Sequence, residues 1–400
     1  MGRKILIVTE VFYPETFIVN DLATELVARG HNVSVMTRQP SYPEGKVYRG
    51  YTNDVHSEEE WRGVHIHRFK TIEGYKSSKL KKILNYCHYV VAGKKLICSL
   101  ARDADVILVH QTGPLTVAFP AVFAKKKFNV PVVVWTFDIW PDAVYMYGFP
   151  KVPPLTMIVD GIIKKVYRSA DRILVSSKAF SDTILQYAPD KEVVYAPNWM
   201  IETIDEKSPV RLPEGKVNFT FTGNISKAQN LENVIRGFAE AAIDDAVLNI
   251  VGNGSSLDDL KELVINLGIR NVLFYGRRPY PEMQDILAQS DFVVLSLVSN
   301  SGIDKTEPLK LQSYLKSGKP IFGVLKGAGR DIISENGLGV CSDPDNPADI
   351  AGGFKVIMGI GEKEKLEIKQ KSSSLMSMRF NREVVISRIE GILRSVWTMR

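Results

Sequence analysis

Short runs of aliphatic and β-branched residues alternate with helical patterns along the whole chain. In the first half, the apolar runs predict strands at residues 4–8, 32–37, 64–69, 105–109, 131–136 and 172–176. Helical patterns lie between them at residues 18–29, 79–100, 115–127 and 154–168. Because this alternation is typical of parallel α/β folds, we expect a parallel sheet covered by helices.

The second half begins the same alternation again. Strands are predicted at residues 217–222, 247–251, 272–275, 292–296 and 320–324, and helices at 231–242, 257–267, 281–289 and 309–317. A polar, proline-containing segment, APNWMIETIDEKSPVRLPEGK, separates the halves and is typical of a linker. Since 400 residues exceed one ordinary core, we predict domains at 1–205 and 206–380. A final helix within 381–400 is expected to pack back on the N-terminal domain.

Composition narrows the class of protein. Hydrophobic residues make up 45% and charged residues 24%, which is ordinary for a soluble protein. No apolar run approaches the roughly 20 residues of a membrane span, and the start lacks a signal peptide. Three widely spaced cysteines without a Cys-x-x-Cys pair argue against a disulfide framework, so we expect a cytoplasmic location. The net charge of +6 suits anionic small molecules, an anionic membrane face or nucleic acid.

Glycines and arginines follow the strands of the second half. In parallel sheets, ligands bind beyond the carboxyl ends of the strands. Gly223 faces the amino end of the next helix, which favours phosphate; the alternative is a plain connection that needs a glycine. Gly252 and Gly254 offer backbone amides. Arg277 and Arg278 could meet a base or a diphosphate, or be two solvated arginines.

The segment after residues 292–296 carries the strongest signal for chemistry. Pro308 is expected at the first helical position, with Glu307 near the N-cap. Lys310 then falls in the first turn, where a cation opposes the helix dipole. An anionic ligand explains such a lysine better than stability does. The alternative is a surface lysine beside a capping glutamate.

Carboxylates and tryptophans follow the strand at 131–136. Asp138 and Asp142 lie beside Trp135 and Trp140 in WTFDIWPD. Aromatic rings can cover the apolar face of a sugar while carboxylates accept protons from its hydroxyl groups. The alternative is a buried structural aspartate with two core tryptophans.

Metal ligation has weak support in the sequence. His65 and His67 alternate on a predicted strand and share a face, but no third ligand is evident. The Asp-x-Asp strings at 103–105 and 343–345 are interpreted as turn chemistry. We therefore expect no metal.

A basic segment in the first half could contact lipid. Lys79, Lys81, Lys82, Lys94 and Lys95 frame an apolar and aromatic helix. A basic amphipathic helix can lie on anionic lipid. The alternative is a core helix with solvated lysines.

Taken together, the motifs resemble family 4 of the retaining GT-B glycosyltransferases. The blocks VGNGSSLDDL and KLQSYLKSGKPI carry the general likeness. The chain also resembles the bacterial O-antigen and capsule subgroup that includes N-acetylfucosaminyl (fucosamine) transferases. The positions that carry this second likeness are Asn20, Asp21, residues 42–46, Asp138, Trp140, Pro141, Gly223, Asn224, Gln229, Pro308, Lys310, Gln312 and Tyr314.

The resemblance implies two Rossmann-like domains that face a central cleft. It further implies that the donor is a UDP-sugar. It also implies a lipid-linked glycan acceptor, no metal or further cofactor, and a place in surface polysaccharide synthesis at the cytoplasmic face of the inner membrane. Lys310 would stabilise the leaving diphosphate, Glu307 would orient the donor sugar, and Asp138 would bind the sugar or the acceptor. Donor contacts are implied for Gly223, Asn224, Gln229, Gly252, Asn253, Arg277, Gln312, Ser313 and Tyr314.

The chain departs from the broader family at charged positions. Asn224 and Gln229 stand where an arginine and a lysine are usual, and Ser313 replaces the second glutamate of a Glu-x7-Glu motif. Phosphate neutralisation therefore falls to Lys310, with Arg277 or Arg330. Two alternatives are a UDP-sugar epimerase of the same fold and a nucleotide or nucleic-acid binder without catalysis. The C-terminal half has no concentrated Arg/Lys tract, which disfavours nucleic acid.

Overall fold

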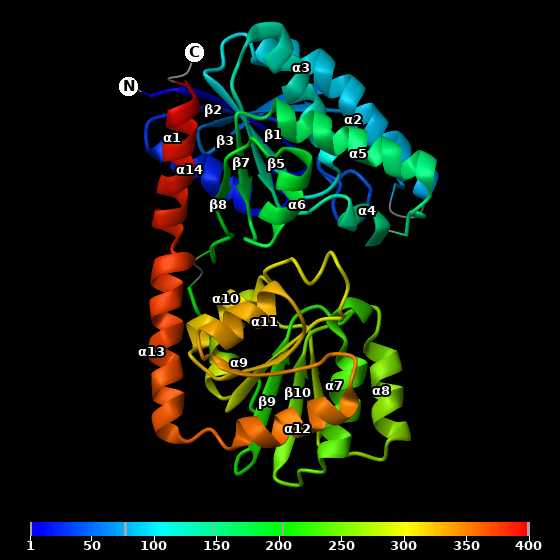
Figure 1. Ribbon diagram of the computed structural model, residues 1–400, viewed down its shortest axis with the longest axis vertical. Coiled ribbons are helices and arrows are strands. Elements are labelled where there is room, and N and C mark those ends of the chain that lie inside the picture. The colour runs from blue at the N-terminus through cyan, green and yellow to red at the C-terminus, as the bar shows by residue number, and fades with distance from the viewer. Residues whose placement is uncertain (1, 76–77, 147, 202–203, 398–400) are drawn as a thin grey trace. The chain divides into compact units, whose positions relative to one another are not determined.

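The chain folds into two compact α/β units. The computed structural model describes residues 2–75, 78–146, 148–201 and 204–397. The first unit comprises Met1–Asn198 and Glu383–Arg400, and the second comprises Trp199–Arg382. Each unit is Rossmann-like, with helices packed against a mainly parallel sheet, which confirms the predicted fold class (Figure 1).

Within the described residues, the sheet of the first unit has eight strands in the order β3-β4-β2-β1-β5-β6-β7-β8. All neighbours pair in parallel except β3 and β4, which are antiparallel. The strands are β1 (Lys4–Thr9), β2 (Asn32–Arg38), β3 (His56–Trp61), β4 (Val64–Phe69), β5 (Val106–Gln111), β6 (Val132–Thr136), β7 (Arg172–Val175) and β8 (Val193–Tyr195).

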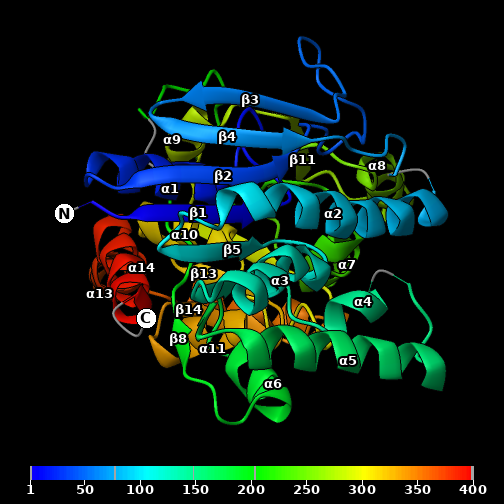
Figure 2. The ribbon, with the colours of Figure 1, turned by 90° about the horizontal axis from the view of Figure 1, so that it is seen from above.

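Three helices of the first unit, α2, α3 and α5, lie side by side over its sheet (Figures 1 and 2). Their apolar faces join the strand side chains in one buried apolar cluster between these helices and the sheet. The helices are α1 (Ile18–Ala28), α2 (Lys79–Leu100), η1 (Leu115–Ala118), α3 (Phe119–Phe128), α4 (Asp142–Met146), α5 (Pro153–Ser169), α6 (Phe180–Tyr187) and α14 (Arg382–Trp397).

The C-terminal helix α14 returns to the first unit. Glu390 is the centre of its polar contacts: Arg29 Nη1 lies 2.8 Å and His31 Nε2 lies 3.1 Å from its carboxylate. Burial opposes ionisation, but hydrogen bonds from Arg29, His31 and Arg394 prevail and lower the pKa of Glu390 to about 2. Arg388 donates to the carbonyl oxygen of Tyr195 over 2.9 Å. These contacts, with the buried apolar side of α14, attach the end of the chain to its beginning.

The sheet of the second unit is wholly parallel. Within the described residues it has six strands in the order β11-β10-β9-β12-β13-β14. The strands are β9 (Val217–Thr222), β10 (Ala246–Val251), β11 (Val272–Gly276), β12 (Phe292–Ser296), β13 (Ile321–Val324) and β14 (Gly339–Ser342).

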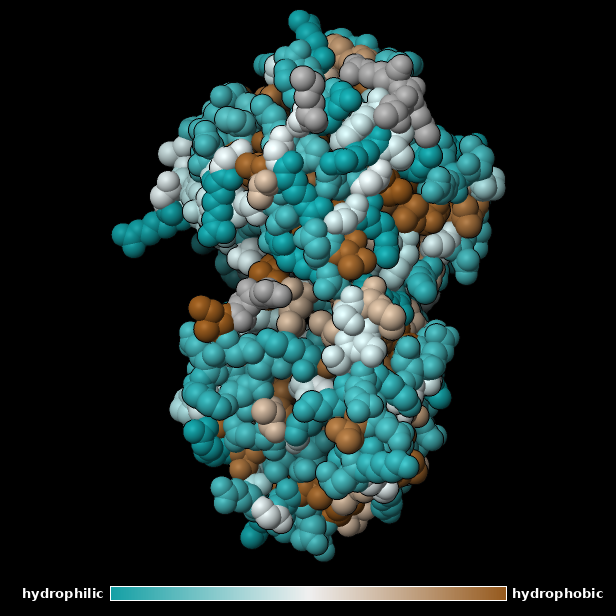
Figure 3. Space-filling view, turned by 90° about the vertical axis from the view of Figure 1, so that its left-hand side faces the viewer, coloured by the Kyte–Doolittle hydropathy of each residue, from teal (hydrophilic) through white to brown (hydrophobic). Residues whose placement is uncertain are grey.

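Helices cover both faces of this second sheet. α7, α8 and α12 enclose one apolar cluster, and α9, α10, α11 and α13 enclose another. The outward surface over α13 and α14 is mostly hydrophilic, with scattered apolar patches (Figure 3). The helices are η2 (Lys227–Gln229), α7 (Leu231–Ala241), α8 (Leu257–Asn266), η3 (Tyr280–Glu282), α9 (Met283–Ala288), α10 (Lys310–Ser317), α11 (Ala328–Glu335), α12 (Pro347–Met358) and α13 (Glu362–Arg379).

Several local predictions need correction. Strands β3, β8 and β14 were not predicted, and β3 is a highly charged strand at the edge of its sheet, where charges protect against aggregation. The prediction that Pro308 is the first helical residue is wrong, because α10 begins at Lys310 with Leu309 as its N-cap. The helices predicted at 115–127 and 281–289 each begin with a 3-10 turn.

Candidate functional site

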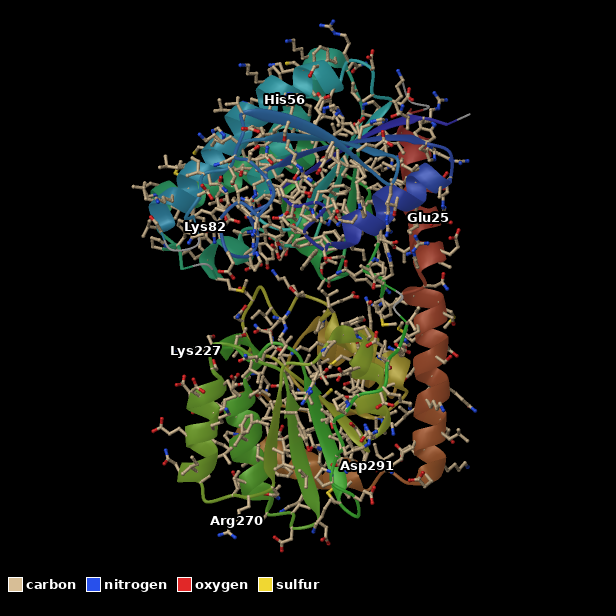
Figure 4. The ribbon with its side chains drawn as sticks, turned by 180° about the vertical axis from the view of Figure 1, so that it is seen from behind. Glu25, His56, Lys82, Lys227, Arg270 and Asp291 are labelled. Atoms are coloured by element: carbon tan, nitrogen blue, oxygen red, sulfur yellow. The ribbon has the colours of Figure 1, made fainter. Side chains whose placement is uncertain are left out.

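Three loops meet at the carboxyl ends of β9, β10 and β11. Gly223 N donates to Val251 O over 2.9 Å, and Gly252 N donates to Gly276 O over 2.9 Å. Lys227 lies at this end of the second unit, whereas Arg270 and Asp291 lie at the opposite end (Figure 4). The backbone therefore forms a continuous rim where a parallel sheet binds its ligand.

The glycines of this rim are required by close approach. A Cβ at position 252 would lie 1.8 Å from Gly223 O, and Gly252 has a φ of 155°. A Cβ at Gly254 would lie 2.1 Å from Ile225 O. At Gly223, with a φ of 128°, a Cβ would lie 2.5 Å from Lys310 Cε. Gly223 thus does more than turn the chain: it makes room for the lysine.

Lys310 reaches this rim from the first position of α10. Its Nζ lies 3.9 Å from the centroid of the Phe221 ring and donates a hydrogen bond to Gln229 Oε1. Both partners are uncharged, and burial lowers the pKa of Lys310 to about 7. The amine also lies at the positive end of a helix dipole. An anion at the rim would relieve both penalties. The structure brings together three of the predicted site residues here: Gly223, Gln229 and Lys310.

Glu307 has a cationic partner in the structure. Its Oε1 lies 2.7 Å from Arg379 Nη2, and both side chains are largely buried. The alternative in which Glu307 caps α10 is wrong, because Leu309 occupies the N-cap and no side chain caps the helix. A contact between Glu307 and a donor sugar would therefore involve a carboxylate that already pairs with Arg379.

Tyr314 supports the rim from inside the core. Its ring is fully buried, and its hydroxyl accepts from Thr222 N over 3.0 Å and donates to Val294 O over 3.1 Å. The prediction that Tyr314 contacts the ligand is therefore corrected to a positioning role at the end of β9. Its neighbour Gln312 is also buried, while the Ser313 carbonyl accepts from Gln284 Nε2 over 3.3 Å.

The exposed rim residues include two predicted asparagines and one arginine. Asn224, Asn253 and Arg277 are exposed, and Asn253 Oδ1 accepts from Gly254 N over 2.7 Å. Arg278, by contrast, is half-buried, and its Nε has no hydrogen-bond partner among the described residues. A buried guanidinium nitrogen without a partner is costly, so Arg278 is a candidate anion ligand beside the predicted Arg277. The sequence alone could not distinguish Arg277 from Arg278, because the two differ in burial, which depends on the fold.

In the first unit, Asp138 follows β6. Burial raises the pKa of Asp138 to about 7, and the negative charge of Glu10 adds to the effect. Trp135 is fully buried and donates from Nε1 to Ala196 O over 2.9 Å. The prediction that the Trp135 ring covers a sugar is therefore wrong, since the ring belongs to the core. Trp140 is half-buried at the edge of the core.

The sequence did not predict a buried ion pair between Arg38 and Glu10. Glu10 is also the residue whose negative charge acts on Asp138. Only 3% of Arg38 is exposed; its Nη1 lies 2.9 Å from Glu10 Oε1, and its Nη2 donates to Tyr75 OH over 3.0 Å. Arg38 Nε and Gln111 Oε1 have no hydrogen-bond partner among the described residues. Glu10 directly follows β1, and Arg38 is the last residue of β2. The rule that ligands bind beyond the carboxyl ends of parallel strands would therefore have selected both residues.

Comparison with known families divides the chain at the same linker. Residues 16–199 match a family described as "Glycosyl transferase 4-like domain". Residues 202–372 match a family described as "Glycosyl transferases group 1". The two matches follow one another and leave only the chain ends and a short linker uncovered.

Individual proteins show the same likeness. The chain is 23% identical to "Probable glycosyltransferase WbjE" of Pseudomonas aeruginosa, over 74% of this chain and 76% of that protein. It is 22% identical to "Putative colanic acid biosynthesis glycosyl transferase WcaI" of Escherichia coli (strain K12), over 88% and 91%. Its fold is similar to that of Anabaena Alr3699/HepE, solved with UDP, with a TM-score of 0.70, 14% identity and coverage of 98% and 100%.

Proposed function

Because the chain belongs to the GT-B glycosyltransferases, with a glycosyl transferase 4-like domain followed by a group 1 domain, we propose a specific transfer reaction. The donor is a UDP-sugar, the acceptor is a lipid-linked glycan, and the anomeric configuration is retained. The transferred sugar is an N-acetylated deoxyhexosamine such as fucosamine. The relative named for colanic acid biosynthesis supports a role in surface polysaccharide synthesis at the cytoplasmic face of the inner membrane.

The observation that carries this proposal is the environment of Lys310. The reaction breaks the bond between the anomeric carbon and a diphosphate oxygen, and UDP leaves with the electron pair. A new bond forms to an acceptor hydroxyl oxygen, whose proton passes to the departing diphosphate. The ammonium of Lys310 would neutralise charge on the departing diphosphate, helped by Arg278. Lys310 meets an aromatic ring and a neutral amide at that position, and an anion would complete its surroundings.

The identity of the nucleotide base and the contacts to the sugar are supported by different observations. The solved relative with UDP has the same fold, which supports uracil as the base. Asp138 is proposed to hold a sugar hydroxyl, because its raised pKa would let the carboxyl group donate as well as accept at neutral pH. We propose that the reaction needs no metal, since Lys310 supplies the positive charge that a diphosphate requires.

Product analysis tests the reaction. We expect UDP and a glycosylated lipid to form together when a UDP-N-acetyl sugar and a lipid-linked glycan are both supplied. Conversion of the donor into an isomer without an acceptor would identify an epimerase instead. Nucleotide binding without turnover of any pair of donor and acceptor would identify a nucleotide-binding protein without catalytic activity. Chromatography of nucleotides and mass spectrometry of the lipid fraction separate these three results.

The surface of α2 supports the membrane part of the proposal. Leu80, Ile83, Leu84 and Val91 are exposed and follow helical spacing along one stripe, which we call the α2 stripe. Exposed Lys81 and Lys95 and half-buried Lys82 and Lys94 lie on the same helix; Lys82 is labelled in Figure 4. The side chain of Lys79 lies outside the described residues.

The amino end of α5 adds two more exposed apolar side chains to this unit, Met157 and Ile158. Lys164 and Lys165 are exposed on the same helix. Among the described residues, no helix is long and apolar enough to cross a membrane. Apolar side chains flanked by lysines suit shallow insertion into an anionic bilayer surface.

Vesicle sedimentation tests this attachment. At low salt, we expect the protein to sediment with vesicles that contain phosphatidylglycerol and to remain free with phosphatidylcholine alone. Replacing Leu80 and Val91 by glutamate removes apolar area and adds negative charge, so binding should fall by at least about tenfold. Ile265→Glu is the matched control, because Ile265 is equally exposed but lies on α8 of the second unit. Equal loss in the control would contradict attachment through the α2 stripe.

A further inference from the structure

The antiparallel hairpin of β3 and β4 gathers histidines and glutamates on one face. Glu58 pairs directly with His67, and Glu60 with His65, while His56 lies two residues before Glu58. Because side chains alternate between faces along a strand, these five side chains share one face. The sequence suggested His65 and His67 without a third ligand; the unpredicted strand β3 supplies the missing groups.

Three of these side chains converge. Glu58 Oε1 lies 3.1 Å from His67 Nδ1 and 3.4 Å from His56 Nε2. One ligand atom from each of the three residues falls within a 4.8 Å group, which we call the hairpin triad. The two imidazole rings are nearly parallel, with an interplanar angle of 11° and centroids 6.3 Å apart. His56 lies on β3, at the edge of the sheet (Figure 4).

These separations match a transition-metal site. A tetrahedral zinc ion with bonds of about 2.0–2.1 Å has neighbouring ligands about 3.3–3.4 Å apart. The two separations from Glu58 are close to this spacing before any ion draws the ligands in. Two imidazoles and a carboxylate suit zinc and similar divalent metals rather than calcium or magnesium, which prefer all-oxygen ligands.

We propose that the hairpin triad binds one Zn²⁺ ion through His56 Nε2, Glu58 Oε1 and His67 Nδ1, with water completing the shell. The ion would join the edge strand β3 to β4 and so stabilise the hairpin. This site is separate from Lys310, which belongs to the other unit, and no step of the proposed sugar transfer uses it. Its test therefore does not depend on the proposed function.

Access from solvent is available. His56 and Glu58 are exposed, and Glu58 and His67 also line a hollow of about 480 Å³. The same hollow is lined by Lys4 and Asn32, which begin β1 and β2, whereas His56 lies outside it and pairs with Phe69 at the carboxyl end of β4. The competing explanation is that histidine and glutamate simply pair across the strands. That explanation predicts no saturable zinc binding.

Calorimetric titration with ZnCl₂ distinguishes the two explanations. The untagged protein carries Cys87→Ser, because Cys87 is an exposed thiol that could bind zinc itself. We expect one ion per chain, with affinity at least about 10–100-fold weaker in His56→Ala and His67→Ala. His65→Ala is the matched control and should retain the parent affinity, since His65 pairs with Glu60 at 3.9 Å outside the triad.

Thermal unfolding provides a second measurement. Zinc should raise the Tm of the parent and of His65→Ala but leave that of His67→Ala unchanged. If His67→Ala does not fold, Glu58→Gln keeps the side-chain shape and should also lose zinc affinity. Absence of saturable binding at about 100 μM zinc, or parent affinity in both His56→Ala and His67→Ala, would overturn the proposal.

Discussion

Lys310→Ala is expected to lower the turnover of sugar transfer by about 10²–10³-fold, the loss measured when one preorganised donor to a developing anion is removed. The physical reason is the position of the amine at the rim formed by Gly223 and Gln229, among uncharged groups. Folding should survive, because removing a partly desolvated charge does not disrupt the core. Steady-state kinetics with a UDP-sugar and circular dichroism measure the two effects.

Lys316→Ala is the matched control for this variant. Lys316 lies on the same helix, and its Nζ lies 2.8 Å from Asp205 Oδ2 in a partly exposed ion pair. Such pairs contribute about 0–1 kcal/mol, so turnover should stay near that of the parent. Normal turnover in Lys310→Ala, or an equal loss in Lys316→Ala, would remove Lys310 from the catalytic centre.

The pH dependence of UDP binding provides an independent signature of Lys310. Burial lowers its pKa to about 7 in the free protein, so at pH 8 the amine is mostly neutral. A bound diphosphate favours the charged form, and binding at pH 8 should therefore take up a proton. Affinity should fall as pH rises above about 7. Calorimetry in buffers of different ionisation enthalpy measures this uptake, which should be absent in Lys310→Ala.

The same titration affects stability with a defined sign. In the unfolded chain Lys310 has its ordinary pKa of 10.5, so between pH 7 and 10.5 the unfolded state holds more protons. The contribution of this group to stability therefore rises with pH across that window. Lys310→Met should remove this rise. A parent and variant with parallel stability profiles would contradict the lowered pKa.

Gly252→Ala is expected to abolish UDP binding and to destabilise the protein by about 3 kcal/mol or more. The new Cβ would lie 1.8 Å from the carbonyl oxygen of Gly223, at a φ of 155° that alanine rarely adopts. Because the obstructing atom is backbone, no side-chain rotation relieves the clash. The loops after β9 and β10 must separate, which dismantles the rim. Urea unfolding and UDP titration measure the two losses.

Gly215→Ala separates backbone strain from the clash. Gly215 also has a positive φ, of 70°, but a Cβ there meets nothing within 4 Å. This variant should lose about 1–2 kcal/mol of stability and keep UDP affinity. If Gly252→Ala bound UDP as tightly as Gly215→Ala does, the contact between the two loops would not be part of the nucleotide site.

The local sequence determined most strands and helices, and it indicated the edge of the second sheet at which the candidate site lies. Strands β4, β9 and β12 appear with the predicted bounds. In β12 (FVVLS) a continuous apolar run matches a fully buried parallel strand, whereas β4 (VHIHRF) alternates apolar and polar residues because part of it is exposed. The rule that ligands bind at carboxyl ends of parallel strands then selected Gly223 and Lys310 as candidates, and the structure brings these two residues together. These inferences depend on spacing within a few residues, which a single chain displays directly.

Only the tertiary structure decided what the remaining side chains do. The edge strand β3 is too polar to read as a strand, yet pairing with β4 builds the hairpin triad. Glu307 meets Arg379 across 72 residues, and Tyr314 enters the core to bond the end of β9. Burial and long-range pairing arise from packing of elements distant in sequence. Residue type and local spacing therefore do not predict which side chains become buried or which distant residues pair.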